Sequence, residues 1–511
     1  MSVRGVHIGL TFLLLAACVV PSHAQRFDAV SRRNPWNGGV NRAGLREDTL
    51  STSYAAVRGI KRDGGMTDHS VSSDSWTAGA VTESIRHLGR LSFAGRFAYD
   101  YSGNSAMCGS MFISPGSYPV DIYEFTPGRK TFENYAFTGG LSADLAEEWR
   151  GGLHFDFTAA DIAKRKDLRH KNTLLDFEAA PSFEWHKGDW RVGGAYIFAK
   201  RTESIAAEEV GSTPDSYEAF FDRGLYFGDC SMWDSNLVHL KDTGISAFAV
   251  RESAHGASLQ LQWRMLYGEA EYRHRSGITG EKGIEWHKFD SDELHGKIVF
   301  TSGGSGGSGG SVHAARLYAD WEQCRNAENI LVRESVGGVT NTEILGRVPI
   351  FMSRQLSLRA EYEWMRGGCD VRVQAEWNSD ARQSLLSYPT VCEERLTWWR
   401  VRAEGLWVVG RKGLLELTAG ASVRKGGTDG LTVRTVQSDR QTNYPQRAEE
   451  YAAWHDEYMT ALRAGAGLAL RVNIARGFYA ELSADYEHGF HLKAVPQPNR
   501  IVSRLSLGCK W

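Results

Sequence analysis

Charged side chains recur at every second position in several parts of the chain, and this spacing places them on one face of a β-strand. In 356–365, for example, Arg359, Glu361 and Glu363 alternate with the apolar Leu358 and Tyr362. Arginine and carboxylate groups in such rows can pair across neighbouring strands or line a path for ions. The residues that we assign to this charged face are Arg359, Glu361, Glu363, Arg372, Glu376, Arg400, Arg402, Glu404, Arg463, Arg471, Glu481 and Asp485.

The charged face has two compatible interpretations. In the first, opposite charges on neighbouring strands neutralise one another inside a narrow, partly filled barrel. In the second, they border a polar pathway that tolerates both cations and anions. The order of residues places Arg463 and Arg471 opposite Glu481 and Asp485 on the next strand, an arrangement that suits either interpretation.

Sequence signals for an enzyme are poor. The chain contains neither a His-Glu-x-x-His motif nor a Cys-x-x-Cys pair, the spacings that zinc hydrolases and redox or metal sites use. We expect His287, Asp290 and Asp292 at the tip of a loop. We therefore predict that the protein is not an enzyme, and we assign no catalytic residue, cofactor or metal site.

The charged residues need strands to position them, and alternation of apolar and polar residues recurs along the chain. In 478–487 the residues Phe478, Ala480, Leu482, Ala484 and Tyr486 share one face, as expected of a strand with one apolar side. Short joints alternate with long polar stretches. The short joints lie near Gly89, Glu147, Gly188, Leu266, Gly367, Arg411 and Gly477, and the long stretches cover 103–130, 163–171, 204–256, 276–291, 324–354, 379–392, 425–454 and 489–498. Within two of these stretches, "SAFAVRE" and "TEILGRVPIF" are expected to be either strand extensions or loop hairpins.

This alternation of short and long connections is typical of a transmembrane β-barrel, in which periplasmic turns are short and extracellular loops are long. We predict an all-β, antiparallel up-and-down barrel of about 14–18 strands, and counting connections favours 18. If the apolar faces meet lipid, the charged faces line the lumen.

Tryptophans cluster beside the short joints. Interfacial aromatic rings are favoured where a membrane meets water, so we predict that one girdle lies at the periplasmic boundary. Its members are Trp149, Trp185, Trp190, Trp364, Trp407 and Trp511.

The two ends of the chain support export to an outer membrane. The N-terminus has a basic start, an apolar run and small residues before Gln25, which predicts a signal peptide over 1–24 that is cleaved after Ala24. A lipobox-like sequence that would leave a lipid on Cys18 is the alternative. The last stretch, "RIVSRLSLGCKW", places Ile501, Leu505, Leu507 and Trp511 on one face, and it resembles the C-terminal signal that the barrel-assembly machinery reads.

The remaining chain divides into two parts. Residues 25–49 are rich in Asn and Gly and lack periodicity, so we expect either a disordered periplasmic lead or a short plug, and 50–511 form the barrel. A tract of Gly and Ser at 302–311 is expected to be a flexible periplasmic turn. The 59 basic and 61 acidic residues leave a net charge of −2, which indicates no nucleic-acid partner.

The stretches "RNPW" at 33–36 and "NRAGL" at 41–45 carry a family resemblance. The whole mature chain resembles a family of Gram-negative outer-membrane barrels described as a domain of unknown function. The second motif is also distantly similar to the turn before the first strand in the long-chain fatty-acid transporter class, although Arg42 stands where that class has proline. The resemblance implies location and fold rather than a substrate.

These observations lead to two expectations for function. The first is a channel or transporter for a small or amphipathic solute, because a barrel of 16–18 strands can leave an aqueous path. The second is a plugged, scaffolding barrel that binds a surface lipoprotein or a larger complex through its loops. In either case we expect outer-membrane lipid and the barrel-assembly machinery as partners.

Overall fold

The computed structural model shows a closed antiparallel β-barrel. Twenty strands form one sheet, of which β8 and β9 make a separate hairpin, and the remaining eighteen close the barrel. The structure describes residues 34–47, 51–166, 169–208, 218–232, 247–281, 283–302, 310–336, 339–385, 392–410, 414–429, 444–474 and 477–511. The strands are Thr52–Asp63 (β1), Asp74–Leu88 (β2), Leu91–Ser110 (β3), Asp121–Asp144 (β4), Trp149–Lys164 (β5), Arg169–Lys187 (β6), Trp190–Glu208 (β7), Glu218–Asp222 (β8), Gly228–Met232 (β9), Ala247–Trp263 (β10), Leu266–Glu281 (β11), Ile284–Ser302 (β12), Val312–Val336 (β13), Val339–Arg366 (β14), Cys369–Ser384 (β15), Cys392–Val409 (β16), Leu415–Asp429 (β17), Arg463–Asn473 (β18), Phe478–Gly489 (β19) and Asn499–Lys510 (β20).

The barrel closes where its first strand pairs with its last. β1 pairs antiparallel with β20, and in this register Val57 lies opposite Leu507. Every other barrel strand pairs with its neighbours in the chain, except that β7 pairs with β10 across the β8–β9 hairpin. Closure leaves the barrel without an open edge, which is the condition for a sheet to span lipid. The predicted fold class is confirmed, and the strand count lies at the upper end of the predicted range.

The alternation in sequence corresponds to two different faces of the wall. Leu358, Leu482 and Leu505 are 43%, 60% and 52% exposed, and they lie on the outer face. The residues between them point to the interior, where charged groups pair with one another. An apolar outer band is what lipid requires of a barrel wall. No helix in the described ranges is long and apolar enough to cross a membrane.

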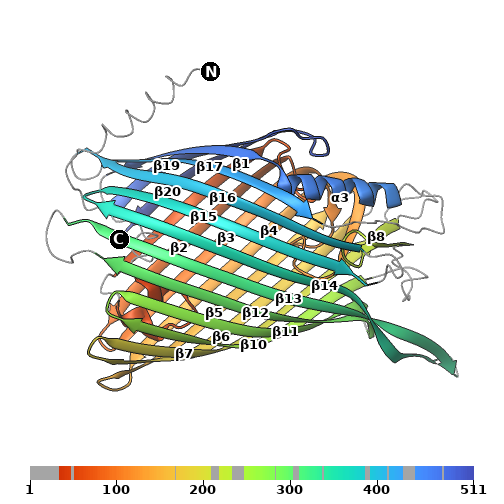
Figure 1. Cartoon of the computed structure of the whole chain (residues 1–511), viewed down its shortest axis with the longest axis horizontal. Helices are drawn as coiled ribbons and strands as arrows, with labels where there is room; N and C mark the ends of the chain where they lie inside the picture. Colours follow the sequence, from red (N-terminus) through yellow and green to blue (C-terminus); the bar gives the residue numbers. More distant parts are fainter. Residues whose placement is uncertain are drawn as a thin grey trace.

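The two ends of the barrel differ in how their strands are connected. At the end that carries Thr52 and Lys510, which we call the turn end, β2–β3, β4–β5, β6–β7 and β10–β11 are joined by a few residues. At the opposite end, which we call the loop end, several connections are longer, and two of them contain the β8–β9 hairpin and the helix α3 (Figure 1). The Gly-Ser tract joins β12 to β13 at the turn end, and 303–309 lie outside the described residues.

Several stretches expected to be loops are strand instead. β11 ends at Glu281 and β12 begins at Ile284, so His287, Asp290 and Asp292 lie within β12 and not at a loop tip. Likewise, 324–354 is mostly a β-hairpin, because β13 and β14 continue to Val336 and from Val339. Beyond Glu328 and before Phe351 these two strands pair only with each other. Figure 1 shows this hairpin projecting past the loop end. Polar composition hid these strands, because polar residues remain compatible with strand pairing outside a membrane.

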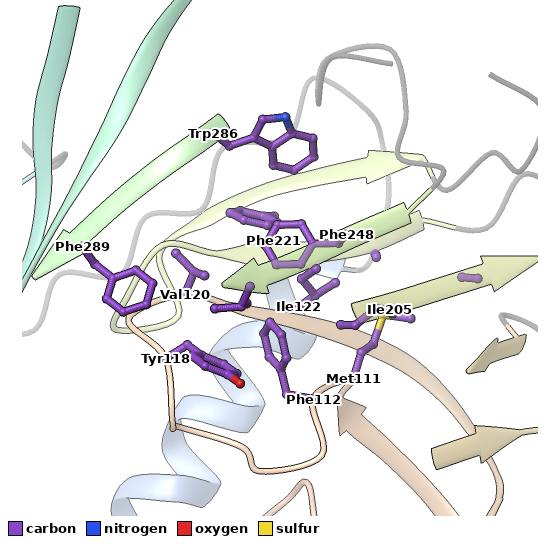
Figure 2. Close-up of a cluster of buried hydrophobic side chains, with 13 residues drawn as sticks. Met111, Phe112, Tyr118, Val120, Ile122, Ile205, Phe221, Phe248, Trp286 and Phe289 are labelled. Atoms are coloured by element: carbon purple, nitrogen blue, oxygen red, sulfur yellow. The ribbon is translucent and has the colours of Figure 1, made fainter. Parts of the chain in front are cut away.

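An apolar cluster fills part of the lumen at the loop end. Met111 and Phe112 from the β3–β4 connection and Ile122 of β4 pack on Phe221 of β8, and on Phe248 and Trp286 of the wall (Figure 2). Phe221 lies 5.7 Å from both Phe248 and Trp286, measured between ring centroids. This cluster holds the β8–β9 hairpin inside the wall, where β8 pairs with the start of β4.

One α-helix covers the loop end. α3 spans Tyr444–Thr460 and packs near β9, β16 and β17. Figure 1 shows it at this end of the barrel, on the same side as β8. Ala448 and Ala452 are fully buried against Tyr123 and Phe220. Small side chains at these two positions allow the helix to approach the aromatic cluster closely.

Candidate functional site

The N-terminal segment 34–47, which we call the plug, lies inside the barrel at the turn end. It contains two short 3₁₀ turns, Pro35–Gly38 (η1) and Ala43–Glu47 (η2). The Asn34 side chain accepts a hydrogen bond of 3.1 Å from the Trp36 amide, and Pro35 occupies the first helical position. An asparagine cap followed by proline favours a helical turn. Asn34, Pro35 and Trp36 of the "RNPW" motif therefore form the start of the plug's first turn.

The second motif fastens the plug to the wall. Asn41 donates to the Phe183 carbonyl at 3.0 Å and to Gln260 Oε1 at 2.9 Å. Its own Oδ1 accepts from the Ala43 amide at 3.0 Å. Arg46 reaches Asp144 on β4 at 2.6 Å. Because Asn41 is only 2% exposed, these bonds satisfy a buried amide that would otherwise be costly.

Glycines make room for the plug. A Cβ at Gly44 would lie 2.6 Å from the Trp36 side chain, and one at Gly193 would lie 2.6 Å from Asn41 Nδ2. At Gly152 on β5, a Cβ would lie 2.2 Å from the Ala43 nitrogen. The wall is thus shaped for this segment. The described residues 34–47 pack against the wall, and 25–33 lie outside the described residues. The division of the chain into a lead or plug over 25–49 and a barrel over 50–511 stays a prediction.

The charged face assigned from sequence consists largely of ion pairs between neighbouring strands. Arg316, which sequence analysis did not single out, binds both Glu361 at 2.7 Å and Glu363 at 2.6 Å. Glu404 binds Arg372 at 3.2 Å and Arg402 at 2.7 Å. Both arrangements join charges across adjacent strands.

The remaining charged residues have other partners. Arg471 binds Glu481 at 2.6 Å, as expected. Arg463 lies 3.7 Å from Glu487 instead, and Asp485 pairs with Arg504 of β20. The expected meeting of Arg463 with Asp485 is therefore wrong, because the register places Arg463 opposite Gly489 and Asp485 opposite Gly467. The other three are placed as follows: Arg359 stacks on Tyr318, Arg400 lies over Trp398, and Glu376 is opposite both Arg359 and Arg400 in the register.

A cavity of about 540 Å³ borders this charged wall. Arg402, Glu404, Glu481, Asp485 and Arg504 line it, along β16 to β20. The hydrogen bonds described for the plug go to β3, β4, β5, β6, β7, β10 and β12, which are not the strands that line this cavity. A second cavity of about 330 Å³ lies beside the plug between Arg42, Arg96, Lys297 and Arg316, with Glu83 and Glu361 among its lining residues.

The six girdle tryptophans lie at or beside strand ends at the turn end. Trp149, Trp190 and Trp511 are 46%, 47% and 61% exposed. Trp190 is opposite Trp263 in the register, and the two rings stack at 5.9 Å. Trp185, Trp364 and Trp407 are half-buried. That this ring of tryptophans marks a membrane boundary stays a prediction.

At the loop end, hydrogen bonds fasten α3 to two connections and to β3. Trp454 donates to the Thr67 carbonyl at 2.8 Å, and His455 Nδ1 lies 2.8 Å from Asp68 Oδ2. Glu457 accepts from three consecutive amides, those of Lys493, Ala494 and Val495, at 2.6, 2.7 and 2.6 Å. Under the helix, the Tyr451 hydroxyl lies 3.1 Å from Cys108 Sγ. We call α3 the lid because these contacts hold it over the opening.

A polar cavity of about 450 Å³ lies beneath the lid. Asp68, His69, Asp222, Arg382 and His455 are among its lining residues. Burial lowers the pKa of His69 to about 4, and burial raises the pKa of Asp222 on β8 to about 6. For Asp68, burial acts to raise the pKa, but the neighbouring His455 outweighs it and leaves the pKa well below its usual range. Sequence analysis missed this group, because Asp68 and His455 are far apart in the chain.

Comparison with known proteins identifies the family. The model of a family described as "Family of unknown function (DUF6850)" matches residues 43–510, so the chain belongs to this family. The predicted family resemblance is confirmed. No curated protein sequence matches.

Solved structures with a similar fold include outer-membrane proteins. A mutant of the ferric enterobactin receptor of Pseudomonas aeruginosa aligns with 9% identity and a TM-score of 0.40, covering 90% of this chain and 80% of that one. The ferric preacinetobactin receptor of Acinetobacter baumannii aligns with 8% identity and a TM-score of 0.38, and the alignment covers 90% of this chain and 80% of that one. The outer membrane protein opdK of P. aeruginosa aligns with 7% identity and a TM-score of 0.32, and the alignment covers 90% of this chain and 99% of that one. The resemblance to the fatty-acid transporter class stays a prediction.

Proposed function

We propose that the chain is an outer-membrane channel for small charged or zwitterionic solutes. The observation that carries this proposal is the cavity of about 540 Å³ along β16–β20, with Arg402 and Arg504 facing Glu404, Glu481 and Asp485. An 18-strand barrel is wide enough to leave an aqueous lumen. A lining with both signs of charge offers a partner to each end of a zwitterion.

In this proposal the plug and the lid restrict the path. The plug occupies the turn end on the side of β4 to β10, and the lid covers the loop end. The turn end faces the periplasm and the loop end faces the cell surface, since short turns are typical of the periplasmic side. We also propose that the chain is exported through a signal peptide that is cleaved after Ala24.

The test is permeation through reconstituted protein. Liposomes that contain the folded chain should swell in small amino acids, and planar bilayers should show ionic current. We compare the wild type with Gly193→Ala, which crowds Asn41 and loosens the plug, and with Gly268→Ala, where a Cβ meets open space. Absence of current and of swelling in all three proteins would overturn the proposal.

One observation favours a second candidate, a barrel that binds a protein partner at the cell surface. The projecting β13–β14 hairpin exposes Ile330, Ile344, Leu345 and Val348, at 47%, 39%, 63% and 42%. Large apolar side chains that are exposed outside lipid can belong to an interaction site. A photo-crosslinker at Leu345 should capture one defined protein in intact outer membranes, whereas one at Glu450 on the lid should not. No specific product at Leu345 argues against this candidate.

A further inference from the structure

Three side chains that bind metals in other proteins meet at the edge of the lid. Asp68 and His69 belong to the connection between β1 and β2, and His455 belongs to α3. Their donor atoms lie within 4.8 Å of one another. His455 Nδ1 is 2.8 Å from Asp68 Oδ2, and His69 Nε2 is 3.7 Å from Asp68 Oδ1. The carboxylate therefore lies between the two imidazoles.

These distances suit one tetrahedral metal ion. Two ligand atoms bound to zinc at about 2.0–2.1 Å are roughly 3.3 Å apart. The two measured distances, 2.8 and 3.7 Å, lie on either side of this value. The two distances end on different carboxylate oxygens, and the donor atoms of the group lie within 4.8 Å, so metal binding requires the Asp68 carboxylate and the two rings to rotate toward one another.

The surroundings orient His69 as a ligand. Its Nδ1 is 2.9 Å from the Ser70 hydroxyl. If Nδ1 carries the proton, it donates a hydrogen bond to Ser70, as the second ring nitrogen of a metal-bound histidine does. Nε2 then has a lone pair that can bind a metal beside Asp68. Nε2 is also 2.8 Å from the Tyr226 hydroxyl, which turns away when a metal binds. The His69 ring stacks on Tyr451 at 4.4 Å, so its orientation is fixed by packing.

A fourth coordination position faces the cavity beneath the lid. Asp68, His69 and His455 all line this cavity of about 450 Å³. It has room for a water molecule or for a donor atom of a solute. Three protein ligands with one open position differ from closed structural zinc sites, which have four.

We propose that Asp68, His69 and His455 bind one divalent transition-metal ion of the zinc class and that this ion joins the lid to the β1–β2 connection. Two imidazoles and one carboxylate suit zinc, cobalt or nickel, whereas calcium and magnesium prefer oxygen ligands alone. On binding, the metal replaces the hydrogen between His455 Nδ1 and Asp68, and the proton moves to Nε2 of the same ring. The competing explanation is that these residues form a hydrogen-bonded latch without a metal. The proposal does not depend on transport.

The first test is a titration of zinc chloride into folded, chelator-treated protein in detergent, followed by calorimetry. The wild type should bind one zinc ion per chain at this site. His455→Gln and Asp68→Asn should each weaken it by at least about tenfold, or 1.4 kcal/mol. His455→Gln is preferred to a His69 variant, because the His455 side chain is 18% exposed and that of His69 is 3% exposed. His491→Asn is the matched control, since His491 lies in a neighbouring connection with a φ of 58° that asparagine tolerates.

The second test uses cobalt(II) as a spectroscopic probe. Four-coordinate cobalt absorbs visible light strongly, so the wild type and His491→Asn should develop this band and His455→Gln should not. Heat-modifiable migration verifies that each variant is folded. Equal zinc affinity in the wild type and His455→Gln, or no zinc binding by the wild type, would overturn the proposal and favour the latch.

Discussion

Ser53 and Trp511 exchange both backbone hydrogen bonds. The Ser53 amide donates to the Trp511 carbonyl at 3.0 Å, and the Trp511 amide donates to the Ser53 carbonyl at 3.0 Å. Trp511 is thus paired with Ser53 of β1, at the seam where β1 and β20 close the barrel. Its side chain is 61% exposed on the outer face. Trp511 therefore combines closure of the sheet with an aromatic ring at the turn end.

Deletion of Trp511 should lower the yield of folded barrel. The deletion removes two hydrogen bonds at the seam and the aromatic end that resembles an assembly signal. The measurement is the fraction of heat-modifiable protein in the outer membrane. Trp511→Phe keeps the backbone pairing and an aromatic ring, so it should remain near the wild type. An unchanged yield after deletion would show that assembly does not read this residue.

The two faces of β19 should differ in their tolerance of charge. Leu482→Arg places a cation on the outer face and should lower the free energy of unfolding by about 2–4 kcal/mol if it lies at the bilayer midplane. Ser483→Arg is the matched variant, because Ser483 lines the lumen cavity beside Glu481 and Asp485. It should cost far less. Equilibrium unfolding in urea, with lipid vesicles present, measures both, and equal losses would mean that the assigned faces are wrong.

Crowding the plug should release it from the wall. Gly193→Ala places a methyl group 2.6 Å from Asn41 Nδ2, and the buried amide then loses its contacts with Phe183 and Gln260. Amide hydrogen exchange of residues 34–47 should become roughly tenfold faster or more, which corresponds to about 1.4 kcal/mol of local stability. Gly268→Ala is the control and should leave this exchange unchanged. Protection that persists in Gly193→Ala would indicate that the plug adapts.

Removing one carboxylate should loosen the lid. Glu457→Ala leaves the amides of Lys493, Ala494 and Val495 without their acceptor. A thiol reagent should then label Cys108, which lies under Tyr451, several-fold faster, as followed by mass spectrometry of the peptide. Glu450→Ala changes an exposed carboxylate on the same helix and serves as the control. If both variants are labelled at the wild-type rate, the lid does not depend on this bond.

Two arginines of the charged face should behave differently. Arg402 is 49% exposed and lines the lumen cavity, so Arg402→Gln should shift the selectivity of any current toward cations. Arg463 is 2% exposed and stacks on Tyr458 of the lid at 3.9 Å, so Arg463→Gln should reduce stability and leave selectivity unchanged. The reversal potential under a salt gradient and the unfolding midpoint distinguish the two effects. If Arg463→Gln shifts the selectivity and Arg402→Gln does not, the ion path does not run through the cavity that Arg402 lines.

The sequence by itself determined the barrel. In the 18 strands that close it, alternation places residues such as Leu358 and Glu361 on opposite faces, because successive side chains in a strand point to opposite sides. The short joints near Gly89 and Gly188 were also predictable, because the alternation of apolar and polar residues is interrupted there. The β11–β12 turn escaped prediction, and the β13–β14 extension was predicted only as one of two alternatives, since strands that leave the membrane no longer need an apolar face.

Only the tertiary structure decided which distant residues meet. Asn41 reaches Gln260, Arg316 joins Glu361 to Glu363, and Asp68 meets His455. A barrel brings each strand against two neighbours, and folded-in segments against many, so these contacts depend on register and on chain closure. Local sequence patterns carry no information about strand register or about chain closure. The charged face was therefore predictable as a set of residues, whereas its pairing, the plug and the group beneath the lid were not.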